Sequence, residues 1–170
     1  IQTTDRWLNM YKKIIPEEEY VHRGYLKHPF PRAGYAAMVT QMDDSVGQIV
    51  SLVDKLGLKE NTLIIFTSDN GPWLPYDTHG GSAGLLREGK GTTWEGGQRV
   101  PGLFWGGSIK PGTISDLGST LDIFPTFLDF AGIDNVNDRI IDGISMKKTL
   151  TNHVSSQRKS ILFYRQREIY

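Results

Sequence analysis

The chain has 170 residues, which is within the size of one domain and long enough to bury a hydrophobic core. Basic and acidic residues number 19 each, so no net charge favours nucleic acid or an anionic membrane as a partner. Cysteine is absent, which excludes a disulfide, a cysteine–zinc site and a cysteine nucleophile within this chain. No apolar run approaches the roughly 20 residues of a membrane span. The first residue, Ile1, is not an initiator methionine, and the sequence is expected to begin within a longer protein.

The first half of the chain predicts a helix followed by a buried strand. Residues 1–31 show weak periodicity, with one short helix expected near residues 5–13. From residue 33 to 56, apolar side chains recur at steps of three and four, which predicts an amphipathic helix that ends at Gly57. Residues 62–67 are β-branched, aromatic or leucine and carry no charge, which is typical of an interior strand covered on both faces. This order is half of a βαβ unit and predicts an α/β fold with the helix packed on the sheet.

Two polar residues, Asp69 and Asn70, come where this strand is expected to end, and Gly71 and Pro72 then force a turn. Open α/β sheets bind ligands at the carboxyl ends of their strands. A carboxylate and an amide held side by side offer the oxygen donors that Ca²⁺ and Mg²⁺ prefer. The alternative is an Asx turn that merely ends a strand, because both residue types are common in turns.

A second group of polar residues lies in a glycine-rich stretch, residues 79–97. So many glycines predict backbone that passes close to another group, and they surround one cation, Lys90. Residues 84–90 also satisfy the pattern G-x-x-x-x-G-K of a phosphate-binding loop. That interpretation is rejected, because Gly91 stands where the Mg²⁺-binding Ser or Thr is required and no buried strand precedes the pattern.

The remaining part of the chain predicts further short elements. Residues 99–105 form a strand, and residues 161–164 begin another that has no evident partner. Asp122, Pro125 and Gly132 bracket a short apolar helix as N-cap, first-turn proline and C-terminal glycine. Asp122 is therefore predicted to be a cap rather than a catalytic residue.

Three patches in this order resemble the arylsulfatase family of the alkaline phosphatase superfamily, including N-acetylgalactosamine sulfatases. They are residues 66–72, 89–101 and 121–126. The resemblance covers most of residues 33–143, and its middle patch is highly specific. It implies an α/β fold, as part of an alkaline-phosphatase-like three-layer domain with a central mixed, mainly parallel sheet. Residues 1–150 would be the later part of the large catalytic domain, and residues 151–170 a linker and the first strand of the small C-terminal domain.

The resemblance also implies roles for individual residues. Asp69 and Asn70 correspond to the second pair of the four oxygen ligands around the family's Ca²⁺. Lys90 corresponds to the catalytic lysine that contacts the substrate sulfate. His79, in the loop between them, is expected to touch substrate. If these residues serve one sulfate, the Lys90 ammonium should lie roughly 4–8 Å from the Asp69 and Asn70 oxygens.

One departure from the family limits what this chain can do alone. The family's nucleophile is a formylglycine made within a C/S-x-P-S-R signature, and that string is absent here. The isolated chain is therefore expected to be inactive and to need the rest of its own sulfatase polypeptide as a partner. The expected substrate is a sulfated carbohydrate or an aryl sulfate. By resemblance, the compartment is periplasmic or secreted in bacteria and lysosomal or secretory in eukaryotes.

Two other functions remain open. A phosphatase or phosphonate hydrolase of the same superfamily would differ in metals and nucleophile, which are set largely outside this chain. A non-catalytic derivative that only binds sugars would be favoured by the loss of Lys90 or Asn70, and both residues are present.

Overall fold

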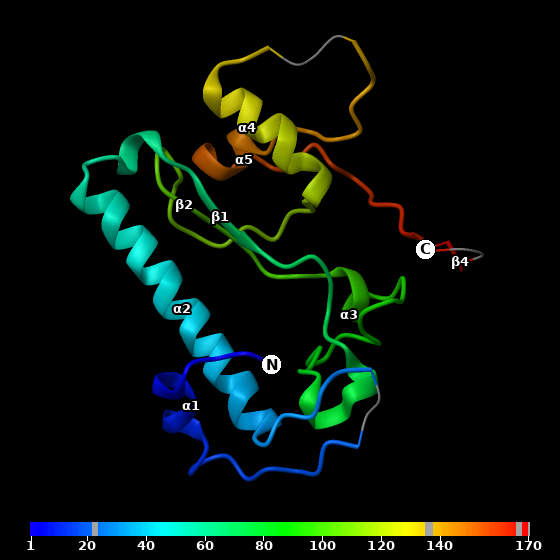
Figure 1. Cartoon of the computed structure of the whole chain (residues 1–170). Helices are drawn as coiled ribbons and strands as arrows, with labels where there is room; N and C mark the ends of the chain where they lie inside the picture. Colours follow the sequence, from blue (N-terminus) through cyan, green and yellow to red (C-terminus); the bar gives the residue numbers. More distant parts are fainter. Residues whose placement is uncertain (22–23, 135–137, 166–167, 170) are drawn as a thin grey trace. The chain divides into compact units, whose positions relative to one another are not determined.

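A computed structural model describes residues 1–21, 24–134, 138–165 and 168–169 (Figure 1). The chain forms two compact units, each built from two segments. The first unit comprises Ile1–Lys59 and Thr67–Pro101, and the second comprises Glu60–Phe66 and Gly102–Tyr170. No helix in the described ranges has both the length and the apolar character needed to cross a membrane.

The first unit is built on one long helix, α2 (Pro31–Lys55). Pro31 starts it, since a proline in the first turn has no amide that needs an intrahelical partner. Gly57 ends it with φ +67°, and the Gly57 and Leu58 amides donate to the carbonyls of Asp54 and Val53. The predicted helix over residues 33–56 is therefore confirmed, with a start two residues earlier.

The shorter helix α1 (Asp5–Tyr11) packs on α2 and confirms the helix expected near residues 5–13. The Tyr11 and Thr40 hydroxyls share a hydrogen bond of 2.6 Å, and Trp7 is buried. Ala33 and Ala37 are fully buried on α2, because small side chains let neighbouring backbone approach closely. The unit also contains the 3₁₀ segment η2 (Leu74–His79) and the single turn α3 (Glu95–Gln98).

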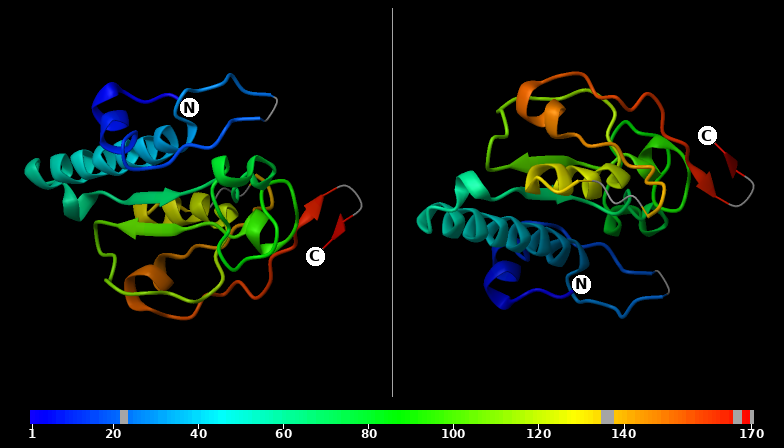
Figure 2. Two further views of the ribbon diagram at one scale, coloured as in Figure 1. Left: turned by 90° about the horizontal axis from the view of Figure 1, so that it is seen from below. Right: turned by 90° about the horizontal axis from the view of Figure 1, so that it is seen from above.

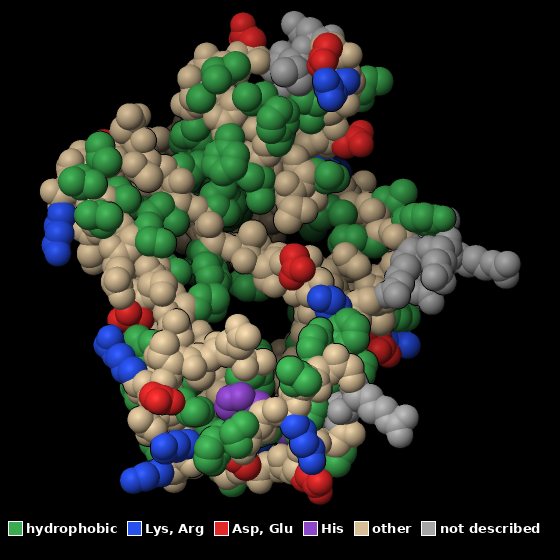
Figure 3. All heavy atoms as spheres, viewed as in Figure 1, with side chains coloured by type: hydrophobic (Ala, Val, Ile, Leu, Met, Phe, Trp, Pro, Cys, Tyr) green, Lys and Arg blue, Asp and Glu red, His purple; other side chains and the backbone are tan. Residues whose placement is uncertain are grey.

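The apolar stripe of α2 is exposed beyond these first turns. Large hydrophobic side chains there are 40–61% exposed: Met38, Val39, Met42, Ile49, Leu52 and Leu56. Apolar side chains accordingly reach the surface over α2 (Figure 3). The apolar stripe of α2 is thus larger than the surface that the described residues bury. The packing of this helix on the sheet stays a prediction.

The second unit contains a sheet of two strands, β1 (Ile64–Thr67), whose last residue belongs to the first unit, and β2 (Gly102–Trp105). Both lie within the predicted strands, residues 62–67 and 99–105. The turn η1 (Lys59–Asn61) precedes β1. Among the described residues β1 has only β2 as a neighbour, and its side chains are half-buried or exposed. The prediction of an interior strand, buried on both faces, is therefore wrong for this chain by itself, because both strands of a two-stranded sheet are edge strands.

Helices follow the sheet: η3 (Thr120–Asp122), α4 (Ile123–Ala131) and α5 (Lys147–Asn152). Figure 2 shows α4 and α5 in two further views. The glycine predicted to end the helix does so, since Gly132 caps α4 with φ +67°. Asp122 caps a different helix from the predicted one, because its carboxylate takes part in the capping of η3 and not of α4. Its carboxylate accepts from the Ser119 amide in a capping box around η3 and makes no bond to the amides of α4.

The most buried side chains of this unit are polar. Asp122 is 1% exposed, and its carboxylate also accepts from the Ile144 amide at 2.8 Å and from two guanidinium nitrogens of Arg158. The Thr126 hydroxyl, fully buried, donates to the Asp122 carbonyl and accepts from the Met146 amide. These bonds tie the start of α4 to residues 142–158, far along the chain. Sequence patterns gave no signal for Arg158.

The chain ends in a short antiparallel hairpin of β3 (Tyr164–Arg165) and β4 (Glu168–Ile169), with Tyr164 opposite Ile169. The predicted strand at residues 161–164 was therefore wrong in position and pairing, because the strand begins at Tyr164 and finds its partner four residues later. The expected domain change at residue 151 stays a prediction.

Candidate active site

The Asp69–Asn70 pair directly follows β1 in a bend. The Ser68 hydroxyl donates to the Asn70 carbonyl at 3.0 Å, and the Asn70 side-chain amide donates to the Gly71 carbonyl at 3.1 Å. These bonds fix the turn and occupy the nitrogen of the Asn70 side chain, which leaves its oxygen as an acceptor. Asp69 is exposed, and its carboxylate makes no hydrogen bond or ion pair to the other described residues.

The glycine-rich segment lies directly against this turn. The Gly71 amide donates to the Gly97 carbonyl at 3.0 Å, and the Lys90 amide donates to the Pro72 carbonyl at 2.8 Å. A β-carbon at Gly71 would overlap the carbonyl oxygen of Gly96. The two predicted site motifs are therefore joined through their backbones, and glycine is required where they touch.

Lys90 is exposed, and its ammonium lies 5.4 Å from the centre of the Trp73 ring. Trp73 is the residue after Pro72, so the ring that the Lys90 ammonium faces belongs to the residue that follows the predicted metal-binding turn. The expected separation of roughly 4–8 Å between the ammonium and the Asp69 and Asn70 oxygens stays a prediction.

The other predicted site residue, His79, faces a different segment. Its ring packs edge-on against Tyr20 at 5.5 Å, and its Nε2 lies 3.4 Å from the Glu18 carbonyl oxygen. These contacts hold η2 against residues 18–20. A role for His79 in substrate binding stays a prediction.

The donor set of the turn suits part of a calcium site. Asp69 and Asn70 supply a free carboxylate and a free amide oxygen, and calcium binds six to eight such oxygens. In the described ranges no three His, Cys, Asp or Glu side chains gather as a metal cluster. The two residues therefore fit a calcium ion whose further ligands come from elsewhere.

This region also contains a buried hydroxyl group that the sequence did not predict. Thr93, in the glycine-rich segment, is 3% exposed, and its hydroxyl has no hydrogen-bond partner among the described residues. Such a buried hydroxyl is uncommon in folded proteins. Thr93 stands between Thr92 and Trp94 in a loop, and this context gave no sequence signal for its burial.

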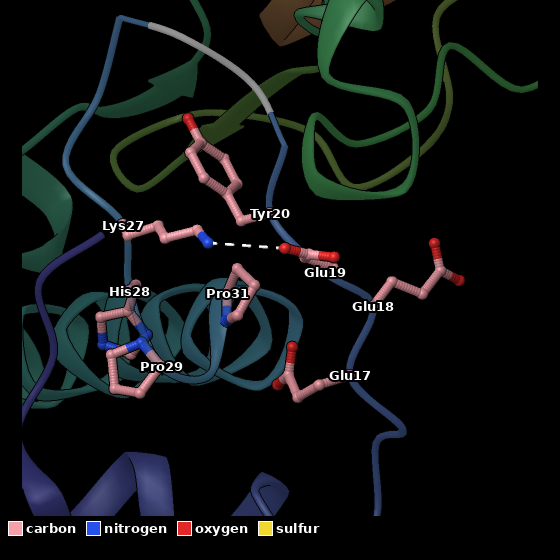
Figure 4. A pocket seen from close by; sticks show the side chains of 8 residues that line it. All are labelled: Glu17, Glu18, Glu19, Tyr20, Lys27, His28, Pro29 and Pro31. Carbon is pink, nitrogen blue, oxygen red and sulfur yellow. Dashed lines mark ion pairs between the residues drawn. The ribbon is translucent and has the colours of Figure 1, made fainter.

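A hollow of about 320 Å³ in the same unit is less suited to bind a sulfate than the surroundings of Lys90 are (Figure 4). Three glutamates line it, Glu17, Glu18 and Glu19, against one lysine, Lys27. The Lys27 ammonium already lies 3.6 Å from a Glu19 carboxylate oxygen. Because its charge is mainly negative, an anionic substrate is better placed at Lys90.

Comparison with known proteins shows the family of the chain. The sequence profile of the sulfatase family matches residues 3–133, which is more than half of the chain. The chain belongs to the sulfatase family. It is 43% identical over 136 residues to human arylsulfatase A, covering 78% of this chain and 26% of that protein. It is 44% identical over 138 residues to rat N-acetylgalactosamine-6-sulfatase, covering 79% of this chain and 26% of that protein.

The fold agrees as well. The crystal structure of Ps i-CgsB in complex with k-i-k-neocarrahexaose superposes with a TM-score of 0.71 and 33% identity, covering 91% of this chain and 31% of that one. The resemblance seen in the sequence is thus confirmed, and the chain has part of the alkaline-phosphatase-like fold of sulfatases. It spans about a quarter of the length of the curated relatives that it matches.

Proposed function

We propose that this sulfatase chain contributes the calcium-binding turn and the catalytic lysine of a sulfuric ester hydrolase. The observation that carries the proposal is the backbone junction between the two motifs. Because the Gly71 amide donates to the Gly97 carbonyl and the Lys90 amide donates to the Pro72 carbonyl, the backbone of the turn is joined to the backbone that carries Lys90. A sulfate ester is a tetrahedral monoanion whose charge is shared by three oxygens, so a calcium ion at the turn and the Lys90 ammonium would each bind a different oxygen.

Each residue then has a distinct task in sulfate ester hydrolysis. Asp69 and Asn70 would hold calcium, which when bound supplies positive charge that polarises the sulfate. Lys90 binds a sulfate oxygen through its ammonium and stabilises the negative charge that grows on the ester as the S–O bond breaks. Its exposure leaves the ammonium accessible to substrate. The nucleophile, a formylglycine by family resemblance, belongs to polypeptide outside this chain, as do the other ligands.

The names of the relatives support a substrate class. One is named for a sulfated amino sugar, another for aryl sulfates, and the solved structure holds a carbohydrate oligomer. We propose a sulfated carbohydrate or an aryl sulfate as substrate, and a periplasmic, secreted or lysosomal compartment, as the family resemblance implies. The exposed stripe of α2 would pack against the rest of the sulfatase polypeptide. Residues 151–170 would lead into its small C-terminal domain.

A substrate comparison tests this function against the phosphatase alternative. The full-length protein is assayed with 4-nitrophenyl sulfate, 4-nitrophenyl phosphate and 4-nitrophenyl phenylphosphonate. We expect the sulfate ester to give the highest kcat/KM, and the isolated 170-residue chain to show no turnover above its Lys90→Ala variant. A preference for either phosphorus ester would overturn the sulfatase assignment. Turnover by the isolated chain would contradict the need for further polypeptide.

A further inference from the structure

A group of aromatic rings adjoins Lys90 in the first unit. Trp73 and Tyr76 have ring centres 6.0 Å apart, and Tyr76 and Tyr25 have ring centres 5.6 Å apart. Trp73 is 42% exposed and Tyr25 is 71% exposed. These three rings, here called the aromatic surface, thus extend from the Lys90 ammonium outward and remain open to solvent at both ends.

The aromatic surface is held in place by its surroundings. The Tyr76 amide donates to the Trp73 carbonyl at 3.1 Å, and a β-carbon at Gly80 would overlap that same carbonyl. Tyr20 stacks on Tyr76 at 6.1 Å with an interplanar angle of 16°. The Thr78 hydroxyl donates to a Glu18 carboxylate oxygen at 2.7 Å, which ties η2 to the segment that carries Tyr20. Trp73 and Tyr76 are therefore held in place before any ligand binds, and ligand binding would not have to order these two rings.

Contiguous exposed apolar surface commonly marks a binding site, and the arrangement of these rings beside an ammonium favours a ligand with two different parts. The faces of aromatic rings are electron-rich and attract the weakly positive C–H groups on one face of a sugar ring. The ammonium at the end of the surface attracts an anionic substituent on that same ring. A sulfated sugar has both parts within one residue.

We propose that Trp73, Tyr76 and Tyr25 form a stacking site for the pyranose ring of a sulfated saccharide, whose sulfate is bound at Lys90. This inference rests on the proposed function, since it names the substrate that the site takes. Trp73 is then the residue that sets specificity, because it contacts both the sugar ring and the side chain of the catalytic lysine.

The test is equilibrium binding by calorimetry to the full-length protein in which the residue that becomes formylglycine, outside this chain, is replaced by alanine, so that bound esters are not hydrolysed. The probes are inorganic sulfate, N-acetylgalactosamine 6-sulfate, galactose 6-sulfate, glucosamine 6-sulfate and 4-nitrophenyl sulfate. We expect at least one sulfated sugar to bind more tightly than inorganic sulfate. Trp73→Ala and Tyr25→Ala should each weaken that sugar about tenfold, as the loss of one ring contact implies. Tyr25→Ala, whose ring is not the one beside Lys90, should change the affinity for inorganic sulfate less than twofold.

Two controls separate stacking from folding. Trp73→Phe keeps a ring and should retain most of the affinity for the sugar. Tyr164→Ala removes a tyrosine that is 70% exposed in the other unit and should change no affinity. The inference is overturned if no sugar binds more tightly than inorganic sulfate, if Tyr25→Ala weakens sulfate and sugar equally, or if only 4-nitrophenyl sulfate is weakened. Sulfated sugars that bind as expected, to a protein that hydrolyses no sulfate ester even with its own nucleophile, would contradict the proposed function and leave the stacking site intact.

Discussion

Substitution of Asp122 by asparagine should destabilise the second unit strongly. The carboxylate is 1% exposed and accepts four hydrogen bonds, from the Ser119 and Ile144 amides and from two nitrogens of Arg158. Asparagine has nearly the same shape, but its NH₂ group would face donors where an oxygen now accepts. The Arg158 guanidinium, whose side chain is 11% exposed, would lose its carboxylate partner.

The expected loss is about 3–5 kcal/mol of unfolding free energy, the usual cost of removing one partner of a buried ion pair. The measurement is denaturant unfolding of the full-length protein, followed by a probe that reports on residues 102–165. The chain offers a matched control in Asp138→Asn. Asp138 also binds an arginine, Arg139, through two hydrogen bonds, but both side chains are more than half exposed. We expect no measurable change for that variant.

The same carboxylate should make stability depend on pH. Burial by itself would raise the pKa of Asp122, but the hydrogen bonds from Arg158, Ile144 and Ser119, with the charge of Arg158, outweigh it and hold the pKa below its ordinary value. The ionised group therefore contributes stability above about pH 4, near the pKa of an aspartate in an unfolded chain, and this contribution is lost as the pH falls through the lower pKa of the folded state. The difference between wild type and Asp122→Asn should accordingly shrink below pH 4. Equal stability of the two proteins at pH 7 would refute the reasoning.

Three further outcomes are expected for the full-length enzyme. Lys90→Ala should lower kcat on 4-nitrophenyl sulfate by about 10²–10³, because a preorganised charge is lost, while circular dichroism stays unchanged; turnover within a factor of three of wild type would contradict this. Asp69→Ala should lower both the activity and the calcium retained after dialysis, measured by atomic emission. Asp69→Asn should retain more calcium than Asp69→Ala because it keeps one oxygen donor. Full calcium retention by Asp69→Ala would show that Asp69 is not a calcium ligand. Gly71→Ala should lower the unfolding free energy by about 1–3 kcal/mol and remove most of the activity, since its β-carbon would force the turn away from Gly96. A fully active and stable variant would show that the two motifs are not held together at this point.

The elements that the sequence predicted well are those whose boundaries depend on neighbouring residues. The helix α2 starts at Pro31, two residues before the predicted start, whereas Gly57 marks its end through the positive φ that glycine tolerates. Gly132 ends α4 for the same reason. The sulfatase resemblance was equally local, since three short patches carried it and the family profile then matched most of the same stretch.

The predictions failed where strand pairing or side-chain contacts depended on residues that are far apart in the sequence. The apolar run before Asp69 indicated an interior strand, but β1 has only β2 beside it among the described residues, since neighbours across a sheet are set by topology. Asp122 read as a simple helix cap, and only folding brought Arg158, 36 positions later, to its carboxylate.

The sequence by itself determined the family, the main helix, and the identity of Asp69, Asn70 and Lys90 as candidate site residues, because these depend on residue type and short spacing. The tertiary structure alone decided that the two motifs touch through Gly71 and Gly96, that Lys90 stands beside Trp73, and that Asp122 is paired in a buried site. The physical reason is that backbone propensity acts over a few residues, whereas burial, ion pairing and ring contacts require the chain to return to the same place after tens of residues.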